Sequence, residues 1–241
     1  MRLQRTGPER GGVTAVHCRA DLSCSTKIEV AFFLRIGTVV DTASQDLPRR
    51  GIDEIDGARA REYALLATLL LHSPDAQLLS GLAGLHGDSS PIGHAHAALA
   101  EAARQSSEES VAREYFALFA GLGDGALLAY ASHYLTDTFY GRPLARLRET
   151  LQHLGIEKAP ERIEPEDHAG FLCEVMAGLV GGDVSGPVGA DRTFFEEHLA
   201  SWIRRFFVDL ETNTSADFYR SVGTLGRIFI DVEAEAFALS A

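Results

Sequence analysis

Apolar side chains recur every three or four residues along most of the chain, a spacing that predicts amphipathic α-helices. The first of these helices begins near Asp56 and ends at His72. Ser73 and Pro74 are expected to start the second helix, which runs to Leu85, with Ser73 as N-cap and Pro74 at the first helical position. The same spacing predicts further helices over residues 94–104, 110–121, 142–154, 166–179, 191–207 with Asp191 as cap, and 215–232.

No segment alternates convincingly between apolar and polar residues, so no β-strand is expected. We therefore predict an all-α, single-domain helical bundle of about eight or more helices, in which short loops make most sequence neighbours antiparallel. The 241 residues are 46% hydrophobic and 23% charged, which is enough apolar material for one sizeable core. The two most apolar stretches, 30–40 and 65–71, are shorter than the roughly 20 apolar residues that a spanning helix needs, and no stable membrane insertion is expected.

Charge is distributed unevenly along the chain. Residues 1–50 carry a net charge of +3 and residues 51–241 carry −15, for a total of −12. Because an acidic chain repels phosphate backbones and attracts cations, no nucleic-acid partner is expected. Residues 1–50 also lack a sustained helical or strand period, and we interpret them as a poorly ordered N-terminal extension or as a misassigned start, with the true start near Val39 or Val40. The all-helical domain is expected over residues 51–241.

Catalytic and metal-binding signatures are weak in this sequence. The glycine-rich residues 121–125 lack the lysine of a phosphate-binding loop and follow a helix instead of a strand. Cys173 lies in the most apolar predicted helix, where a cysteine usually behaves as a small buried hydrophobe. The spacing of Cys18 and Cys24 matches no common metal-ligand pattern. We expect no metal site, no cofactor and no enzymatic activity.

The segment Glu164-Pro165-Glu166-Asp167-His168 places three carboxylates and an imidazole at the start of a hydrophobic helix. One interpretation is an N-terminal cap, because Pro165 fixes the backbone and the helix dipole stabilises acidic groups in a first turn. A second is recognition, because carboxylates bind arginine guanidinium groups in a bidentate geometry that lysine cannot match. A third is general acid–base catalysis by Asp167 and His168 in a small hydrolase, although no nucleophile, metal or oxyanion donor accompanies them.

This segment resembles the Glu-Pro-x-Asp-His motif of the TorD/DmsD/NarJ-type chaperones, the redox enzyme maturation proteins that serve bacterial molybdoenzymes. Other similar elements occur in the family's order: Arg61-Glu62-Tyr63, Tyr115 with Leu118-Phe119, and residues 129–135. The resemblance covers roughly residues 58–237. The sequence departs from the family pattern at Ala129, where a proline is common, and in its long N-terminal extension.

The resemblance implies a TorD-like fold and a cytoplasmic, system-specific chaperone. Such a protein binds the twin-arginine leader or the apo form of a molybdenum-cofactor oxidoreductase and delays export until the cofactor is inserted. The expected partner is the apo catalytic subunit of that molybdoenzyme with its leader, and formate dehydrogenase is the preferred client. A homodimer formed by helix exchange is a further implication, with residues 157–164 or 183–189 as the hinge. The alternative is a generic all-helical interaction protein without leader-peptide binding.

The resemblance also assigns peptide-binding residues. The motif, together with a loop expected to face the same groove, contributes seven of them: Glu164, Pro165, Asp167, His168, Tyr130, Ser132 and Tyr134. Two more residues, Tyr115 and Phe119, have the helical spacing of core positions. Either packing or direct contact with the peptide would make these two aromatic residues important for binding.

Overall fold

The computed structural model of the chain describes residues 53–120, 126–137, 140–158 and 164–239. Within these ranges the protein is all-α, with ten α-helices, one π-helical turn and no β-strand, so the predicted fold class is confirmed. The predicted extension over residues 1–50, the glycine-rich loop 121–125 and most of the hinge expected at 157–164 lie outside the described residues.

The helices follow one another along the chain with short connections. They are α1 (Glu54–Leu71), α2 (Ala76–Ala83), α3 (Pro91–Gln105), α4 (Glu108–Tyr115), the π-helical turn η1 (Phe116–Ala120), α5 (Ala131–Thr136), α6 (Arg142–His153), α7 (Ala169–Val180), α8 (Ala190–His198), α9 (Ile203–Thr212) and α10 (Phe218–Leu239). None of these described helices is both long and apolar enough to cross a bilayer.

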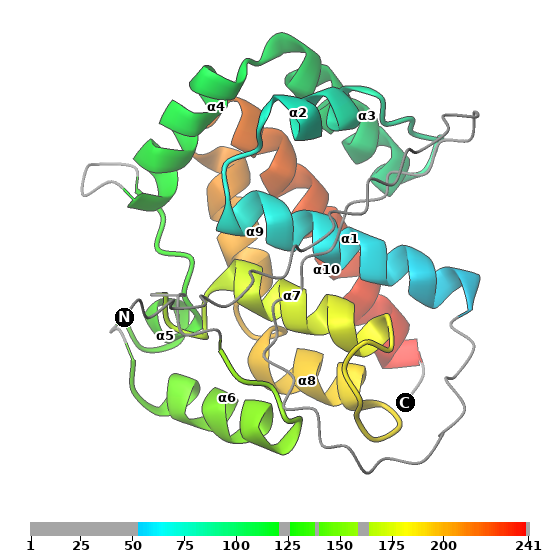
Figure 1. The fold of residues 1–241 in the computed structure, drawn as a ribbon, viewed down its shortest axis with the longest axis vertical. Coiled ribbons are helices and arrows are strands. Elements are labelled where there is room, and N and C mark those ends of the chain that lie inside the picture. Colours follow the sequence, from blue (N-terminus) through cyan, green and yellow to red (C-terminus); the bar gives the residue numbers. More distant parts are fainter. Residues whose placement is uncertain (1–52, 121–125, 138–139, 159–163, 240–241) are drawn as a thin grey trace, which may run out of the picture.

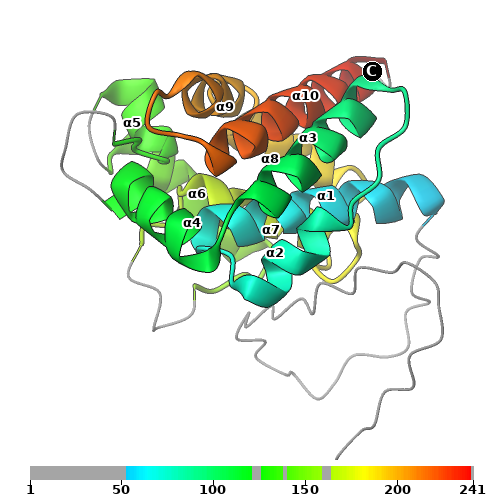
Figure 2. The same cartoon turned by 90° about the horizontal axis from the view of Figure 1, so that it is seen from above.

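Two helices far apart in the sequence, α1 and α7, pack together at the centre of the molecule (Figure 1). The long helix α10 packs against α9 and α3 and also contacts α1, as the view from above shows (Figure 2). At the lower end, α8 packs on α7, and α6 contacts both α5 and α8. The helix that follows residues 164–168 is therefore held in the middle of the bundle.

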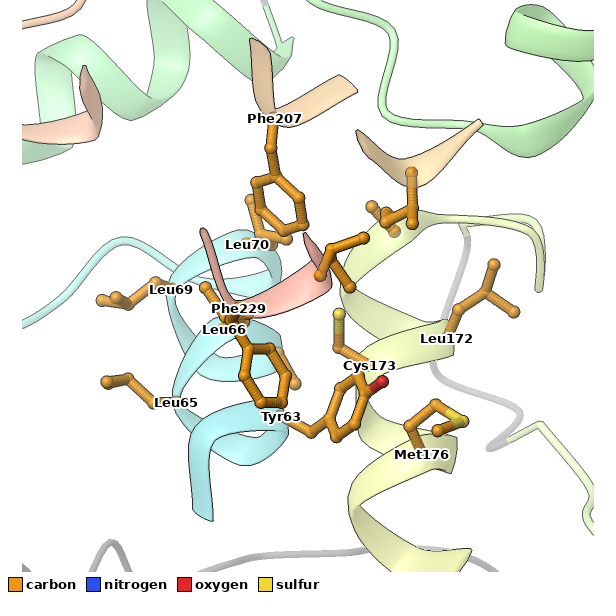
Figure 3. Packing of buried hydrophobic residues seen from close by; sticks show 14 of the residues in the cluster. Tyr63, Leu65, Leu66, Leu69, Leu70, Leu172, Cys173, Met176, Phe207 and Phe229 are labelled. Carbon is orange, nitrogen blue, oxygen red and sulfur yellow. The ribbon is translucent and has the colours of Figure 1, made fainter. Parts of the chain in front are cut away.

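The core forms where side chains from these central helices meet (Figure 3). Tyr63 of α1 packs edge-on against Phe229 of α10, with ring centroids 4.7 Å apart, and Cys173 of α7 lies beside Tyr63. Full burial of a side chain of this size contributes roughly 1.5–3 kcal/mol to stability. This packing fixes the position of α7 and so of the segment that leads into it.

Two glycines allow helices to cross at short distance. A Cβ atom at Gly170 of α7 would lie 2.7 Å from Cγ of Leu71 on α1, and one at Gly226 of α10 would lie 2.2 Å from the Phe207 ring on α9. Larger residues at these positions would overpack the contact, which typically costs about 1–3 kcal/mol. The close crossings were not predicted from the sequence, because the spacing of apolar residues does not show which helices pack against each other.

The predicted caps of two helices are wrong. Ser73 does not cap α2, because Asp75 Oδ1 accepts a hydrogen bond from the Leu78 amide at 2.8 Å and α2 starts after Asp75. Serine and aspartate are equally good N-caps, so residue type alone did not favour Ser73 over Asp75. Similarly, Gly189 is the residue before α8, and Asp191 lies within the first turn of that helix.

The segment predicted as one helix over 191–207 is two helices, α8 and α9. In a continuous helix the His198 carbonyl would accept a hydrogen bond from the Trp202 backbone amide. Here the same carbonyl accepts the indole N–H of Trp202 at 2.7 Å, while the Trp202 amide donates to the Leu199 carbonyl at 3.0 Å. The buried tryptophan thus interrupts the helix that the apolar spacing predicted.

Other boundaries also differ from the prediction, among them the start of the last helix at Phe218 instead of Ser215. The helix predicted over 110–121 begins at Glu108 and changes into the π-helical turn at Phe116. The helix predicted from Glu166 begins three residues later, at Ala169. The stretch around Tyr130, predicted as loop, contains the short helix α5. The last two changes both fall on the predicted site.

Candidate functional site

The motif segment, residues 164–168, is joined to the start of α5 by backbone hydrogen bonds. The Ala131 amide donates to the Asp167 carbonyl at 3.0 Å, and the Ala169 amide donates to the Ala129 carbonyl at 2.7 Å. These contacts make an isolated antiparallel bridge between Tyr130 and His168. The starts of α5 and α7 therefore lie next to each other, although 35 residues or more separate them in the sequence.

The Asp167 side chain strengthens this junction. It is almost completely buried, at 1% exposure, and its Oδ2 accepts a hydrogen bond from the Ser132 amide at 2.8 Å. Asp167 therefore satisfies a free amide in the first turn of α5, where a negative charge is also favoured by the helix dipole. Asp167 Oδ1 and Ser132 Oγ are buried and have no hydrogen-bond partner among the described residues.

His168 is the N-cap of α7. Its Nδ1 accepts a hydrogen bond from the Gly170 amide at 3.1 Å, which requires an unprotonated Nδ1. The imidazole is also buried and packs edge-on against the Tyr130 ring, with centroids 5.2 Å apart. The capping interpretation of the motif is therefore correct for its last residue, with an imidazole in the role predicted for the carboxylates. A buried imidazole that is already used in this way is poorly placed to act as a general base on a substrate.

Glu164 and Tyr130 form the exposed part of the motif site. The Tyr130 hydroxyl donates a hydrogen bond to the Glu164 carboxylate. Burial, reinforced by this carboxylate, raises the pKa of Tyr130 well above its ordinary value, so the hydroxyl stays protonated. The Glu164 carbonyl accepts a hydrogen bond from Lys158 Nζ at 3.1 Å. Pro165 lies between Glu164 and Glu166, and its carbonyl accepts a hydrogen bond from the His168 amide at 3.3 Å, which turns the segment toward α7.

Glu166 has a partner that the sequence did not predict. Arg148 of α6 donates from Nε at 3.1 Å and from Nη2 at 2.8 Å to the same oxygen, Oε2. The Glu166 side chain is 12% exposed, while that of Arg148 is 54% exposed. Burial acts to raise the pKa of Glu166, but the hydrogen bonds and charge of Arg148 hold it below the ordinary value. No local signal connects the two residues, because they lie 18 positions apart on different elements.

Tyr115 and Phe119 pack together next to the motif site. Their ring centroids are 5.1 Å apart, and both contact the Tyr219 ring of α10, at 5.9 Å and 5.3 Å. The Tyr115 hydroxyl donates to the Leu70 carbonyl at 3.2 Å. Burial and, second, the charge of Glu164 raise the pKa of Tyr115, so this ring lies within electrostatic reach of the motif. Both side chains are half-buried, and the neighbouring Phe116 of the π-helical turn is 65% exposed.

Tyr134 contacts α9. Its hydroxyl donates to the Asp209 carboxylate at 2.8 Å, its ring lies 5.4 Å from that of Trp202, and the Arg205 guanidinium stacks over it at 5.5 Å. The structure thus brings together Glu164, Pro165, Asp167, His168, Tyr130 and Ser132 in direct contact. Tyr115 lies within electrostatic range of Glu164, and Phe119 packs on Tyr115. It ties Tyr134 to a different part of the surface.

The groups in this site are suited to hydrogen bonding and ion pairing. Among the described residues, no three His, Cys, Asp or Glu side chains gather as a metal ion would require. Burial raises the pKa of the Cys173 thiol to about 12, which leaves it a core residue without nucleophilic character near neutral pH. What the site offers to a ligand is two partly exposed carboxylates beside aromatic rings, a surface suited to a cationic, partly apolar peptide.

The family model and the named relatives that this chain matches support its assignment to the TorD-like redox enzyme maturation chaperones. The chain belongs to the nitrate reductase delta subunit family, whose model matches residues 86–208, about half of the chain. All the predicted site residues, from Tyr115 to His168, lie within the matched range.

Two named relatives point to the same class. The chain is 27% identical over 120 residues to the probable Tat proofreading chaperone DmsD of Haemophilus influenzae. The aligned residues cover 49% of this chain and just over half, 57%, of that protein. It is 26% identical over 170 residues to the chaperone protein TorD of Vibrio cholerae, which covers 66% of this chain and 77% of that protein. Both relatives are named as chaperones and neither as an enzyme.

Proposed function

We propose that this protein is a cytoplasmic, system-specific chaperone without enzymatic activity or a cofactor of its own. It binds the twin-arginine leader, or a nearby segment of the apo form, of a molybdenum-cofactor oxidoreductase and delays export until the cofactor is inserted. The observation that carries the proposal is that Glu164, which accepts a hydrogen bond from Tyr130, and Glu166 lie on one segment anchored by the buried Asp167 carboxylate. The names of the relatives, a Tat proofreading chaperone and chaperone TorD, support it.

The two carboxylates supply the ionic part of the proposed interaction. Glu164 is exposed and Glu166 is partly exposed, and a guanidinium group makes shorter and stronger hydrogen bonds to carboxylates than neutral donors do. The net charge of −15 over residues 51–241 attracts a cationic leader from a distance. Binding should therefore weaken as the salt concentration rises.

The aromatic residues supply the apolar part. Tyr115, Phe116 and Phe119 are partly or largely exposed at the end of α4 and in the π-helical turn, and Tyr115 is close enough to Glu164 for that charge to raise its pKa. A leader combines arginines with an apolar stretch, so adjacent acidic and aromatic surfaces match both of its parts. π-Helical turns occur often at functional sites, where they turn side chains away from the regular helical direction.

The buried motif residues act in this proposal by holding the contact residues in place. Asp167 satisfies the start of α5 and His168 caps α7, so both maintain the junction from which Tyr130 and Glu164 project. Substitution of either should impair binding through a loss of local order. Glu164 is the better probe of direct contact, because its side chain is exposed.

We further propose formate dehydrogenase as the client, residues 51–241 as the folded unit, and helix exchange between two copies as a route to a dimer. A panel of leader peptides from formate dehydrogenase and from reductases of trimethylamine N-oxide, dimethyl sulfoxide and nitrate would test the client by calorimetry. A higher affinity for any other leader would contradict the assignment of formate dehydrogenase as the client. Light scattering after size-exclusion chromatography would test the dimer, and a single monomeric species at all concentrations would contradict it.

The decisive experiment is calorimetric titration of the purified chain with a synthetic twin-arginine leader peptide. We expect saturable binding that weakens with added salt, and a roughly fivefold loss of affinity in Glu164→Gln, because one exposed charge pair is worth about 1 kcal/mol. Glu235→Gln is the matched control: it removes an exposed carboxylate of α10 near the C-terminal end and should leave the affinity unchanged. Absence of binding to every leader, or equal losses in both variants, would favour the generic helical interaction protein.

A further inference from the structure

Arg148 lies across one of the two carboxylates that the proposed leader arginines would use. Its Nε and Nη2 atoms both donate to Glu166 Oε2, at 3.1 Å and 2.8 Å. The site thus already holds a guanidinium group of the same chemistry as the expected ligand. This guanidinium comes from α6, a helix on which none of the matching motif elements lies (Figure 1).

We propose that Arg148 is an internal occupant of the leader-arginine site and that it is displaced from Glu166 when the leader binds. The inference rests on the proposed function, because it concerns the same ligand. Leader binding is then an exchange of one guanidinium for another at Glu166. Arg148 is an internal competitor in this scheme, and Glu166 is the group that both arginines share.

The unequal burial of the two partners supports an exchange. Glu166 is mostly buried, and a carboxylate in that position is costly to leave without a cationic partner. Arg148 is more than half exposed, so its guanidinium can return to water at little cost. The carboxylate therefore needs a guanidinium at all times, and the identity of that guanidinium is open to competition.

A cavity beside the pair gives the displaced side chain somewhere to go. It has a volume of about 400 Å³ and is bordered by Arg148 and Glu166 themselves, with Leu151 and Ile156 among its apolar walls. The aliphatic part of an arginine side chain packs well on such apolar walls while its head stays in water. Lys158, at the same cavity, already donates to the Glu164 carbonyl and leaves the Glu166 carboxylate to the arginine.

The hydrogen-bonding geometry at Glu166 favours arginine over lysine in the incoming peptide. An incoming guanidinium can reproduce both N–H donations that Arg148 makes to Glu166, so the exchange loses no hydrogen bond. A lysine ammonium is a more strongly hydrated point charge without the planar fork, and it would replace two well-directed donations by a weaker set. With Arg148 in place, a twin-lysine peptide should displace it poorly.

The test compares the wild type with Arg148→Ala and Arg146→Ala, each titrated with a twin-arginine leader and with the same peptide carrying two lysines. Arg146 lies on the same helix, is exposed, and loses the same charge on substitution, so it controls for net charge. We expect Arg148→Ala to bind both peptides about fivefold more tightly, because removal of an internal competitor raises both affinities by the same factor. Arg146→Ala should change neither affinity by more than the smaller effect of one net charge.

The outcomes separate this inference from the proposed function. If the wild type binds the leader but Arg148→Ala binds it no more tightly, the internal-occupant role is wrong and the proposed function stands. Equal gains in Arg148→Ala and Arg146→Ala would reduce the effect to net charge and would also overturn it. If neither the wild type nor Arg148→Ala binds any leader, both proposals fail.

Discussion

Two arginine–glutamate ion pairs lie in different surroundings. Arg59–Glu233 is in the interior, and Arg148–Glu166 is at the motif site. Arg59 donates from Nε and Nη2 to the two separate oxygens of Glu233, at 2.8 Å and 2.9 Å. The Tyr63 hydroxyl adds a third hydrogen bond to Glu233 at 3.0 Å. Arg148, in contrast, directs both donors to a single oxygen of Glu166.

Burial separates the two pairs still further. The side chains of Arg59 and Glu233 are 18% and 2% exposed, whereas Arg148 is 54% exposed. Arg59 also reaches Asp56 and Asp191, so the inner pair connects α1, α8 and α10. Because both oxygens of Glu233 accept hydrogen bonds and the pair is buried, the inner pair is part of the fold. In the other pair only one oxygen of Glu166 is used and the arginine is half exposed, so another ligand can replace the arginine. The same chemistry therefore serves structure in one place and binding in the other.

The largest expected effect is on the inner pair. Glu233→Ala leaves the Arg59 guanidinium and the Tyr63 hydroxyl without their buried acceptor, and we expect a loss of about 3 kcal/mol in the free energy of unfolding. Glu166→Ala should lose less than about 1 kcal/mol, because Arg148 can turn to water. Urea denaturation followed by circular dichroism measures both. Losses of similar size in the two variants would remove the distinction between a structural and an exchangeable pair.

A medium effect is expected at Asp167, which combines burial with a place in the motif. Asp167→Ala removes the acceptor of the Ser132 amide at the start of α5, and the loss of such a cap costs about 1–2 kcal/mol of stability. Leader affinity should fall with it, because the junction that carries Tyr130 and Glu164 loosens. Thermal unfolding and calorimetry on the same samples test both effects.

Glu164→Gln serves as the control for Asp167. It should lower leader affinity with no change in thermal stability, because Glu164 is exposed. Unchanged stability together with abolished binding in Asp167→Ala would instead make Asp167 a direct contact residue, as its free Oδ1 atom would then allow.

Sequence periodicity was enough for the fold class and for most helices, because apolar spacing reports directly on which residues form a core. It failed where a side chain competes with the backbone, as Trp202 does when its indole takes the His198 carbonyl and divides one predicted helix in two. It also failed to distinguish between adjacent capping residues, such as Ser73 and Asp75. In each case two local arrangements have similar energies, and the spacing of apolar residues does not distinguish them.

The candidate site was predictable in its motif and less so in its surroundings. Tyr130 and Ser132 could be associated with residues 164–168 only through a family resemblance, and the structure joins them through backbone and side-chain hydrogen bonds. Arg148 carried no signal at all, since its partner lies on another element 18 residues away. Tyr134 shared the motif's stretch of sequence but contacts α9, because the short helix α5 turns it toward Asp209.

The smallest expected effect concerns a third pair, between His96 of α3 and Glu62 of α1, which lies between the first two in burial. His96 Nε2 is 3.0 Å from Glu62 Oε2, and the side chains are 22% and 12% exposed. The hydrogen bond to Glu62 raises the pKa of His96, while partial burial opposes the rise. A histidine with a raised pKa in the folded state contributes stability that is fully present below its unfolded pKa of about 6.5 and is lost as the pH rises through the folded value.

The free energy of unfolding of the wild type should therefore fall by about 0.5–1 kcal/mol more than that of His96→Gln between pH 6 and pH 8.5. Burial lowers the pKa of His198, which acts in the opposite direction, but this contribution is common to both proteins and cancels in the difference. His153→Gln, at an exposed position of α6, should behave as the wild type does. A pH dependence that is identical in wild type and His96→Gln would show that even a mostly buried pair of this kind adds nothing, and would place the threshold for a structural ion pair closer to the fully saturated Arg59–Glu233 geometry.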